Sequence, residues 1–154
     1  MSPNLNVIEK LTVGKVIGLS DGGGFVRSFS DHPRKIYLSR SEMAEVFSGD
    51  KVSVQIVGRD RLGRLKGHIE DVLERAHKKI VGRYFKDVAG GLVRVDDARE
   101  HQVVRVPSEN ADDIKDGQVV IVDILQYPSK KKPASGRIIK VIGEYMTADI
   151  QAEI

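Results

Sequence analysis

Acidic and histidine side chains are the residues of this chain that could carry catalysis or hold a metal ion. Asp96 and Asp97 are adjacent in sequence, as are Asp112 and Asp113, and the four histidines are dispersed. Adjacent carboxylates in a loop are typical of solvated turns, and dispersed histidines lack the close ligand spacing of a zinc site. We therefore predict no catalytic residue, no metal site and no cofactor in this chain.

Clustered cations indicate binding rather than catalysis. They occupy two stretches, the first containing Arg59, Arg61, Arg64 and Lys66 with one acid, Asp60, and the second containing Lys130, Lys131, Lys132 and Arg137 with no acid. Clustered cations gain affinity for phosphates by releasing counterions. A basic loop can also serve solubility alone. Because two such loops fall at equivalent places of an internal repeat, we favour RNA as the ligand.

Aromatic rings accompany the first cluster. A glycine turn, residues 22–24, leads into Phe25, Val26 and Arg27, and a second apolar stretch, residues 36–38, contains Tyr37. Rings on an open strand can stack on nucleobases, although a hairpin with core aromatics would have the same pattern. The binding interpretation predicts that Phe25 and Tyr37 are more exposed than core rings and lie close together on one sheet face.

Composition limits the class of protein. The chain has 154 residues, 40% of them apolar, and no cysteine, which favours compact β domains in a reducing compartment such as the cytoplasm. Its pI of about 9.1 is at the level of nucleic-acid-binding domains, although the formal net charge is only +3. No apolar run approaches the length of a membrane span, and residues 1–10 lack the hydrophobic segment of a secretory signal.

An internal repeat indicates that the fold is built twice, because Gly24 to Arg27 match Gly91 to Arg94. Five short strands with a helical turn after the third predict an OB-type Greek-key barrel in each copy. The fold class is thus all-β, with two tandem five-stranded OB-fold Greek-key barrels. We expect an N-terminal arm at 1–10, a first barrel at 11–75 and a second at 76–154. The expected strands are 12–19, 23–29, 35–38, 51–58, 64–73, 79–85, 91–95, 102–106, 118–126 and 136–142, with helical turns at 39–47, capped by Ser41, and at 110–114.

The order of these motifs resembles the tandem cold-shock domains of bacterial ribonuclease R, in the ribonuclease II family. The matching stretches are residues 13–18, 36–39 and 49–52 in the first copy, and 81–85 and 136–138 in the second. The resemblance implies a segment that guides single-stranded RNA to the catalytic domain of a 3′ to 5′ exoribonuclease, a domain absent from this chain. It implies magnesium only in that domain, contacts with that domain and with further OB domains, and a monomer.

Departures from a free-standing cold-shock protein imply weaker stacking. Val16 stands in place of a tryptophan, Gly23 in place of a phenylalanine, and Ser39 and Arg40 in place of a histidine and a phenylalanine, whereas Lys15 and Tyr37 keep the family's residue types. In the second copy only Tyr84, next to Arg83, remains as a candidate ring. Since each ring contributes about 1–3 kcal/mol, binding should rely more on charge. The predicted RNA-binding residues are Lys15, Phe25, Arg27, Tyr37, Arg40, Arg59, Arg61, Arg64, Lys66, Arg83, Tyr84, Lys130, Lys131, Lys132 and Arg137.

Two alternatives stay open. One is a stand-alone RNA chaperone of two cold-shock barrels, which the missing rings disfavour. The other is an OB-type module for protein interaction, for which an exposed apolar face without stacking rings would be suitable. Salt-sensitive binding to a short oligonucleotide separates this second alternative from both RNA interpretations.

Overall fold

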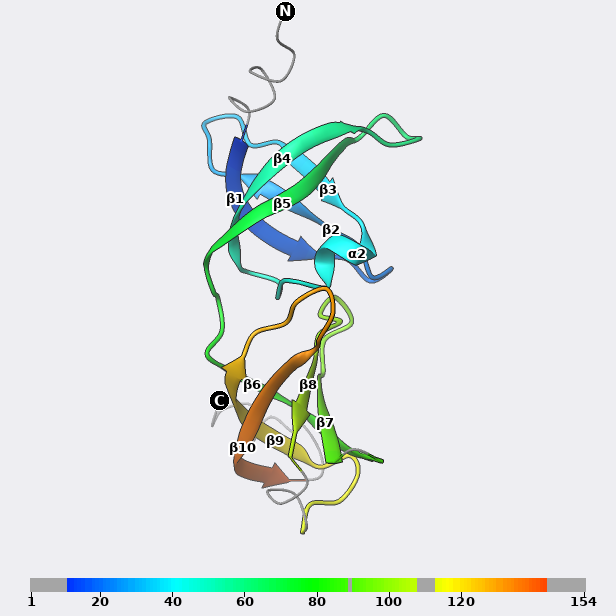
Figure 1. The fold of residues 1–154 in the computed structure, drawn as a ribbon, viewed down its shortest axis with the longest axis vertical. Helices are drawn as coiled ribbons and strands as arrows, with labels where there is room; N and C mark the ends of the chain where they lie inside the picture. Colours follow the sequence, from blue (N-terminus) through cyan, green and yellow to red (C-terminus); the bar gives the residue numbers. More distant parts are fainter. Residues whose placement is uncertain (1–10, 89, 108–112, 144–154) are drawn as a thin grey trace, which may run out of the picture. The chain divides into compact units, whose positions relative to one another are not determined.

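Two compact units make up the chain in the computed structural model, which describes residues 11–88, 90–107 and 113–143 (Figure 1). The first unit comprises Met1–His77 with Ala98–Glu100, and the second comprises Lys78–Asp97 with His101–Ile154. Each contains one closed five-stranded barrel, so the predicted all-β class with two OB-type barrels is confirmed. Within the described part of the chain, no helix is long and apolar enough to cross a membrane.

The first barrel closes in the order β1-β2-β3-β5-β4. Strand β3 pairs in parallel with β5, and the other neighbouring strands pair antiparallel. Its five strands are β1 (Leu11–Gly18), β2 (Gly24–Ser28), β3 (Lys35–Leu38), β4 (Lys51–Arg59) and β5 (Leu65–Glu74). All five coincide with expected strands to within one residue at each end.

The core of the first barrel is formed by apolar residues that recur along its strands. Val26, Ile36 and Val54 are fully buried members of a single cluster, and on β3 both neighbours of Ile36 are more exposed than Ile36 itself. β-Branched side chains suit this arrangement because they fill the pleated inner surface with little rotamer freedom to lose. One face of each strand is thereby left for binding.

A short helix, α2 (Arg40–Met43), follows β3 and differs from its prediction. Its N-cap is Ser39, which has extended backbone angles and whose hydroxyl accepts a hydrogen bond from the Glu42 amide (3.3 Å), so the assignment of the cap to Ser41 is wrong. The helix is also shorter than the expected 39–47. The Glu42 carboxylate anchors it to β5 by accepting from the Ile69 amide and contacting His68 Nδ1, both at 2.9 Å.

The second barrel repeats this order as β10-β8-β7-β6-β9. Its strands are β6 (Lys79–Asp87), β7 (Gly90–Val95), β8 (Val103–Val106), β9 (Val119–Gln126) and β10 (Ala134–Gly143). Tyr84, the largest fully buried side chain among the described residues, lies inside it beneath Gly91. A Cβ at Gly91 would overlap Cε1 of that ring, so glycine is required there for close packing. The expected turn at 110–114 lies largely outside the described residues.

Candidate nucleic-acid interface

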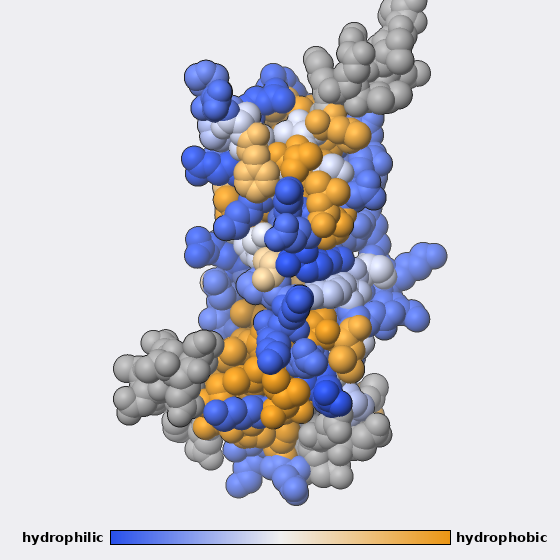
Figure 2. All heavy atoms as spheres, turned by 90° about the vertical axis from the view of Figure 1, so that its left-hand side faces the viewer, coloured by the Kyte–Doolittle hydropathy of each residue, from blue (hydrophilic) through white to orange (hydrophobic). Residues whose placement is uncertain are grey.

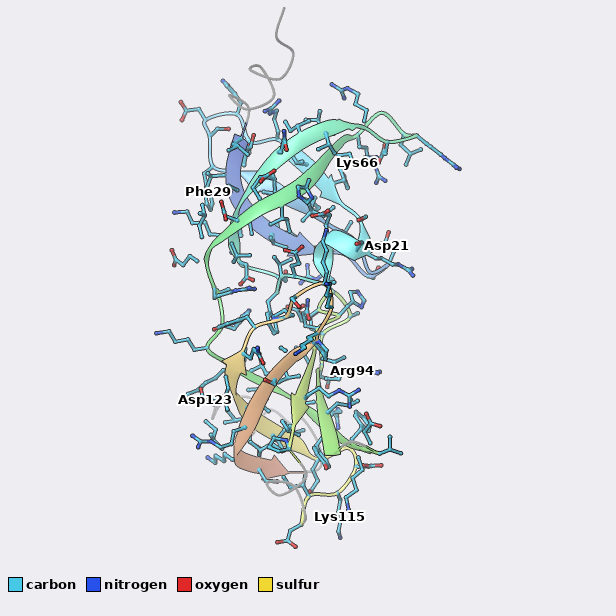
Figure 3. The ribbon with its side chains drawn as sticks, viewed as in Figure 1. Asp21, Phe29, Lys66, Arg94, Lys115 and Asp123 are labelled. Carbon is cyan, nitrogen blue, oxygen red and sulfur yellow. The ribbon has the colours of Figure 1, made fainter. Side chains whose placement is uncertain are left out.

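The pairing of the strands aligns the outward-facing side chains of the first barrel in rows that run across neighbouring strands. In one row Ile17 pairs with Phe25, Phe25 with Tyr37, and Tyr37 with Lys66. The two rings lie with centroids 5.7 Å apart at an interplanar angle of 47°. The prediction that Phe25 and Tyr37 lie close together on one face is therefore confirmed. Lys66, labelled in Figure 3, extends this row onto β5.

A second row, two residues along β1, consists of cations. Lys15 pairs with Arg27 on one side and with Lys51 on the other, and Arg27 pairs with Lys35. Lys15, Arg27 and Lys35 are exposed, whereas Lys51 is half-buried. We call these four residues the cationic row. Like charges on adjacent strands repel one another, so their alignment favours an anionic ligand over this face.

The exposure of the two rings differs from the expectation. Tyr37 is half-buried, as a ring that meets a ligand would be, but Phe25 is only 8% exposed. Phe25 lies outside the core cluster, and its low exposure follows from neighbours on the outer face: Ile17 and Tyr37 flank it, and Lys35 Nζ lies 4.9 Å from its ring centroid. The expectation that both rings are more exposed than core rings holds clearly for Tyr37, whereas Phe25 is buried almost as fully as the core rings Phe47 and Tyr84, each 1% exposed.

The β4–β5 hairpin is ordered by its single acid, Asp60. The Asp60 Oδ1 atom accepts from the amides of Leu62 and Arg64, both at 2.9 Å, and Oδ2 accepts from Arg64 Nε at 2.7 Å. Partial desolvation opposes ionisation, yet the hydrogen bonds from Arg64 and Leu62 hold the pKa of Asp60 below its ordinary value. The hydrogen bond to the Asp60 carboxylate in turn raises the pKa of Arg64.

The predicted cations of this hairpin therefore have different surroundings. Arg59 Nη1 donates to the Gly63 carbonyl at 2.7 Å, and Arg64 lies over the Tyr37 ring, its Cζ 4.2 Å from the centroid. Arg61 and Lys66 are exposed. Arg40 lies elsewhere: its Nε donates to the Asp21 carbonyl at 2.8 Å, so it supports the turn between β1 and β2, near the Asp21 label in Figure 3.

Tyr84, the candidate ring of the second barrel, cannot stack on a base in this fold. Its side chain is 1% exposed and points into the barrel. The repeat aligns Tyr84 with Val16, and Val16 is itself a core position with no exposure. The assignment of Tyr84 to RNA binding is therefore corrected to a packing role. Phe85, the next residue, is on the outer face in register with Leu92.

Two cations of the second barrel's outer face are paired with carboxylates. Arg83 Nε contacts Asp96 Oδ2 at 3.3 Å, and its Nη1 donates to the Gly117 carbonyl at 3.1 Å. Arg105 forms an ion pair with Asp87, and this hydrogen bond, with one from the Val88 amide, lowers the pKa of Asp87. Such pairing reduces the positive charge that this face presents to a phosphate.

The β9–β10 hairpin presents the second predicted basic cluster. The Ser129 hydroxyl accepts from the amides of Lys131 (3.3 Å) and Lys132 (3.2 Å), and the Ser129 amide donates to the Lys132 carbonyl at 2.9 Å. Lys130, Lys131 and Lys132 are exposed around this turn, and Arg137 is exposed on β10 in register with Asp123.

The sequence interpretation missed several outward-facing residues. Lys35 and Lys51 complete the cationic row of the first barrel. In the second barrel Arg94, labelled in Figure 3, occupies the place of Arg27. Arg105 occupies the place of Tyr37. Alternation along the expected strand 35–38 would have placed Lys35 outward, because it precedes the buried Ile36. The ion pairs of Arg83 and Arg105, by contrast, depend on the pairing of separate strands.

The carboxylates of the described residues do not gather into a cluster with metal-ligand spacing. Among residues 11–88, 90–107 and 113–143, no group of three or more His, Asp or Glu side chains is placed to hold a metal ion. Asp96 contacts Arg83 rather than a second carboxylate. We therefore derive no metal-dependent step for the described residues.

The barrels, their strand order and their paired outer rows define a tandem OB-fold protein of the cold-shock type. The sequence comparisons agree: residues 14–72 match the family model of the ribonuclease B OB domain, and residues 92–154 match that of the cold shock domain. The chain is 36% identical over 148 residues to ribonuclease R of Acidithiobacillus ferrooxidans, and 35% identical over 144 residues to ribonuclease R of Escherichia coli. Each alignment covers 94% of this chain.

The chain therefore matches the tandem OB and cold-shock region of ribonuclease R. It spans 33% of the length of the first relative and 18% of the second. Solved structures show the same fold: Mycoplasma genitalium RNase R in complex with ribose-methylated single-stranded RNA has a TM-score of 0.75 at 17% identity, over 92% of this chain and 23% of that one. Yeast Ssd1, a pseudonuclease, has a TM-score of 0.74 at 14% identity, over 99% of this chain and 25% of that one.

Proposed function

We propose that this chain binds single-stranded RNA and guides it toward the separate catalytic domain of a 3′ to 5′ exoribonuclease. The observation that carries the proposal is the outer face of the first barrel, where the cationic row lies next to the row of Phe25 and Tyr37. Phosphates spaced along a strand can pair with the cations while a base lies over the aromatic row. The relatives named ribonuclease R support the nuclease context.

A single strand suits this face better than a duplex. Bases of an A-form duplex are stacked inside, and its deep, narrow major groove does not admit side chains. A strand with unstacked bases can contact the half-buried Tyr37 and the flanking cations together. Mycoplasma genitalium RNase R, which shares this fold, has been solved in complex with single-stranded RNA, and that complex is consistent with this ligand class.

The two barrels should contribute unequally. The first has the neighbouring rings of Phe25 and Tyr37 beside an exposed row of cations, whereas the described part of the second has a single outward ring there, Phe85, and pairs Arg83 and Arg105 with carboxylates. The second barrel also presents a cluster of three exposed lysines, Lys130, Lys131 and Lys132. We infer that the first barrel holds bases and phosphates and that the second adds mainly electrostatic attraction.

The proposed role contains no chemical step within the described residues. Hydrolysis by this family would need a cluster of carboxylates holding magnesium, and the described residues do not bring three such ligands together. We therefore expect the purified chain to leave a labelled single-stranded RNA intact in the presence of magnesium. Shortening of the RNA by a preparation free of contaminating nuclease would refute this part of the proposal.

The experiment that tests binding is a fluorescence-anisotropy titration of a labelled RNA of about ten nucleotides, within the range of one or two OB folds. We expect the single strand to bind more tightly than the same RNA annealed to its complement. With roughly four to six phosphate contacts at about 0.7 each, log affinity should fall against log salt with a slope of about −3 to −4. A slope near zero, or a preference for the duplex, would refute the proposal.

A protein-interaction module is the second candidate, and it rests on exposed apolar side chains. Leu125, Ile139 and Val141 on β9 and β10 are 64%, 43% and 42% exposed. Figure 2 shows apolar atoms gathered over the second barrel between scattered polar ones. Contact with the catalytic or further OB domains of a parent enzyme would cover such side chains. This candidate would be favoured if the affinity for RNA changed neither with salt concentration nor with substitutions on the outer face of the first barrel.

A further inference from the structure

The ring of Tyr37 does not present a bare face at the interface, because the guanidinium of Arg64 lies over it. The Arg64 Cζ atom is 4.2 Å from the ring centroid, within the range of a cation–π interaction. The same guanidinium is ion-paired with Asp60 at 2.7 Å, and the Arg64 side chain keeps 43% of its surface exposed. Its position is therefore held from two directions while part of the group still faces solvent.

We propose that Arg64, seated on Tyr37 and held by Asp60, presents the stacking surface for an RNA base. Asp60 is the positioning residue in this arrangement. The inference rests on the proposed function and adds which group the base meets. Planar guanidinium groups stack on nucleobases as aromatic rings do, so a base, Arg64 and Tyr37 would form three successive layers.

The position of Asp60 supports this assignment. A carboxylate in a basic hairpin repels phosphates, and its removal would raise the positive charge of the loop. Yet Asp60 accepts from the Leu62 and Arg64 amides and from the Arg64 side chain, so it fixes both the turn and the guanidinium. Arg59 closes the same turn through the Gly63 carbonyl. The bonds to the two amides order the turn for any role of the hairpin, and the bond to Arg64 Nε in addition holds the guanidinium over Tyr37.

The inference changes the role predicted for Arg64 from a phosphate contact to a base contact. A phosphate contact needs charge, and lysine would supply it. A stacking contact needs a plane, which lysine lacks. The substitution Arg64→Lys therefore separates the two roles without changing the net charge.

The test compares Arg64→Lys, Asp60→Asn and a control, Glu70→Gln, which removes an exposed acid farther along β5. The probes are a fluorescein-labelled oligouridylate of about ten nucleotides and an oligomer of the same length without bases. For Arg64→Lys we expect at least about fivefold weaker binding to oligouridylate, which corresponds to the lower end of the free energy of stacking one base. Its affinity for the abasic oligomer and the salt slope of binding should not change. Asp60→Asn should also weaken binding to oligouridylate, because Arg64 loses the carboxylate that holds it. Glu70→Gln removes the same charge without touching Arg64, so it should slightly strengthen binding to both probes.

A spectroscopic measurement separates positioning from folding. The Arg64 Nε–H resonance of the unmodified protein should be shifted by the ring current of Tyr37 and protected from solvent by Asp60, and Asp60→Asn should abolish both effects while the amide spectrum of the barrel is retained. Equal affinity of Arg64→Lys and the unmodified protein for oligouridylate would overturn the inference, as would tighter binding by Asp60→Asn to the extent seen for Glu70→Gln. Absence of binding by the unmodified protein would instead refute the proposed function.

Discussion

Neutralising the cationic row should change the salt dependence of RNA binding by an amount set by the number of phosphates it contacts. Lys15, Arg27 and Lys35 are exposed on three adjacent strands and paired in register, so a strand crossing them would meet all three. Three contacts at about 0.7 each correspond to a slope change of about 2 in log affinity against log salt. In the triple variant with glutamine at these positions, the drop in affinity between about 50 mM and about 200 mM salt should be smaller by about 15-fold.

The assay is a titration of a fluorescent single-stranded RNA at four or five salt concentrations. The matched control carries glutamine at Lys78, Lys86 and Lys115, three exposed lysines outside the proposed interface, so its net charge is the same. Its slope should remain close to that of the unmodified protein. Equal slopes for the two triple variants would show that net charge alone controls binding, and this would refute the assignment of contacts to the cationic row.

Three further predictions concern the second basic hairpin and the two barrel folds. Reversing the charges at residues 130–132 should flatten the salt slope by about 2 without changing base preference, as read from titrations with different homopolymers, because phosphate contacts carry no base information. Asp50→Ala should destabilise the first barrel by about 3 kcal/mol in urea unfolding. The reason is that the fully buried Asp50 carboxylate is ion-paired with Arg75 at 3.0 Å and accepts hydrogen bonds from two backbone amides. A loss of stability below about 1 kcal/mol would contradict this. Gly91→Ala should lower the thermal stability of the second barrel by about 1–3 kcal/mol, because the added Cβ would overlap the Tyr84 ring; an unchanged melting temperature would show that the ring moves aside without cost.

Most of the fold could be predicted from local pattern. Alternation of apolar residues identified the strands of both barrels, and the recurrence of the glycine turn identified the repeat. The helix boundary was the main local error, because Ser39 and Ser41 are both acceptable caps by residue type. Only the extended backbone at Ser39 and its bond to Glu42 distinguish them.

The candidate site was less predictable, because its geometry depends on how strands pair. An alignment of the repeat placed Tyr84 next to Arg83 but did not show which of the two faces the barrel interior. This matters because successive residues of a strand point to opposite faces of the sheet. In the sequence Asp60 is an isolated acid among cations, whereas in the structure it organises the hairpin and holds Arg64 over Tyr37. The ion pairs of the second barrel join strands that are distant in sequence and leave no local signal.

An NMR titration of the isotope-labelled chain with a short single-stranded RNA shows directly whether the outer face of the first barrel binds RNA. We expect the largest shifts on the outer face of the first barrel, at Lys15, Phe25, Arg27, Lys35 and Tyr37, with smaller shifts around residues 130–132. Inward-facing residues such as Val26 and Tyr84 should move least. Shifts confined to Leu125, Ile139 and Val141 on β9 and β10, or no shifts at a concentration that saturates a cold-shock protein, would contradict it.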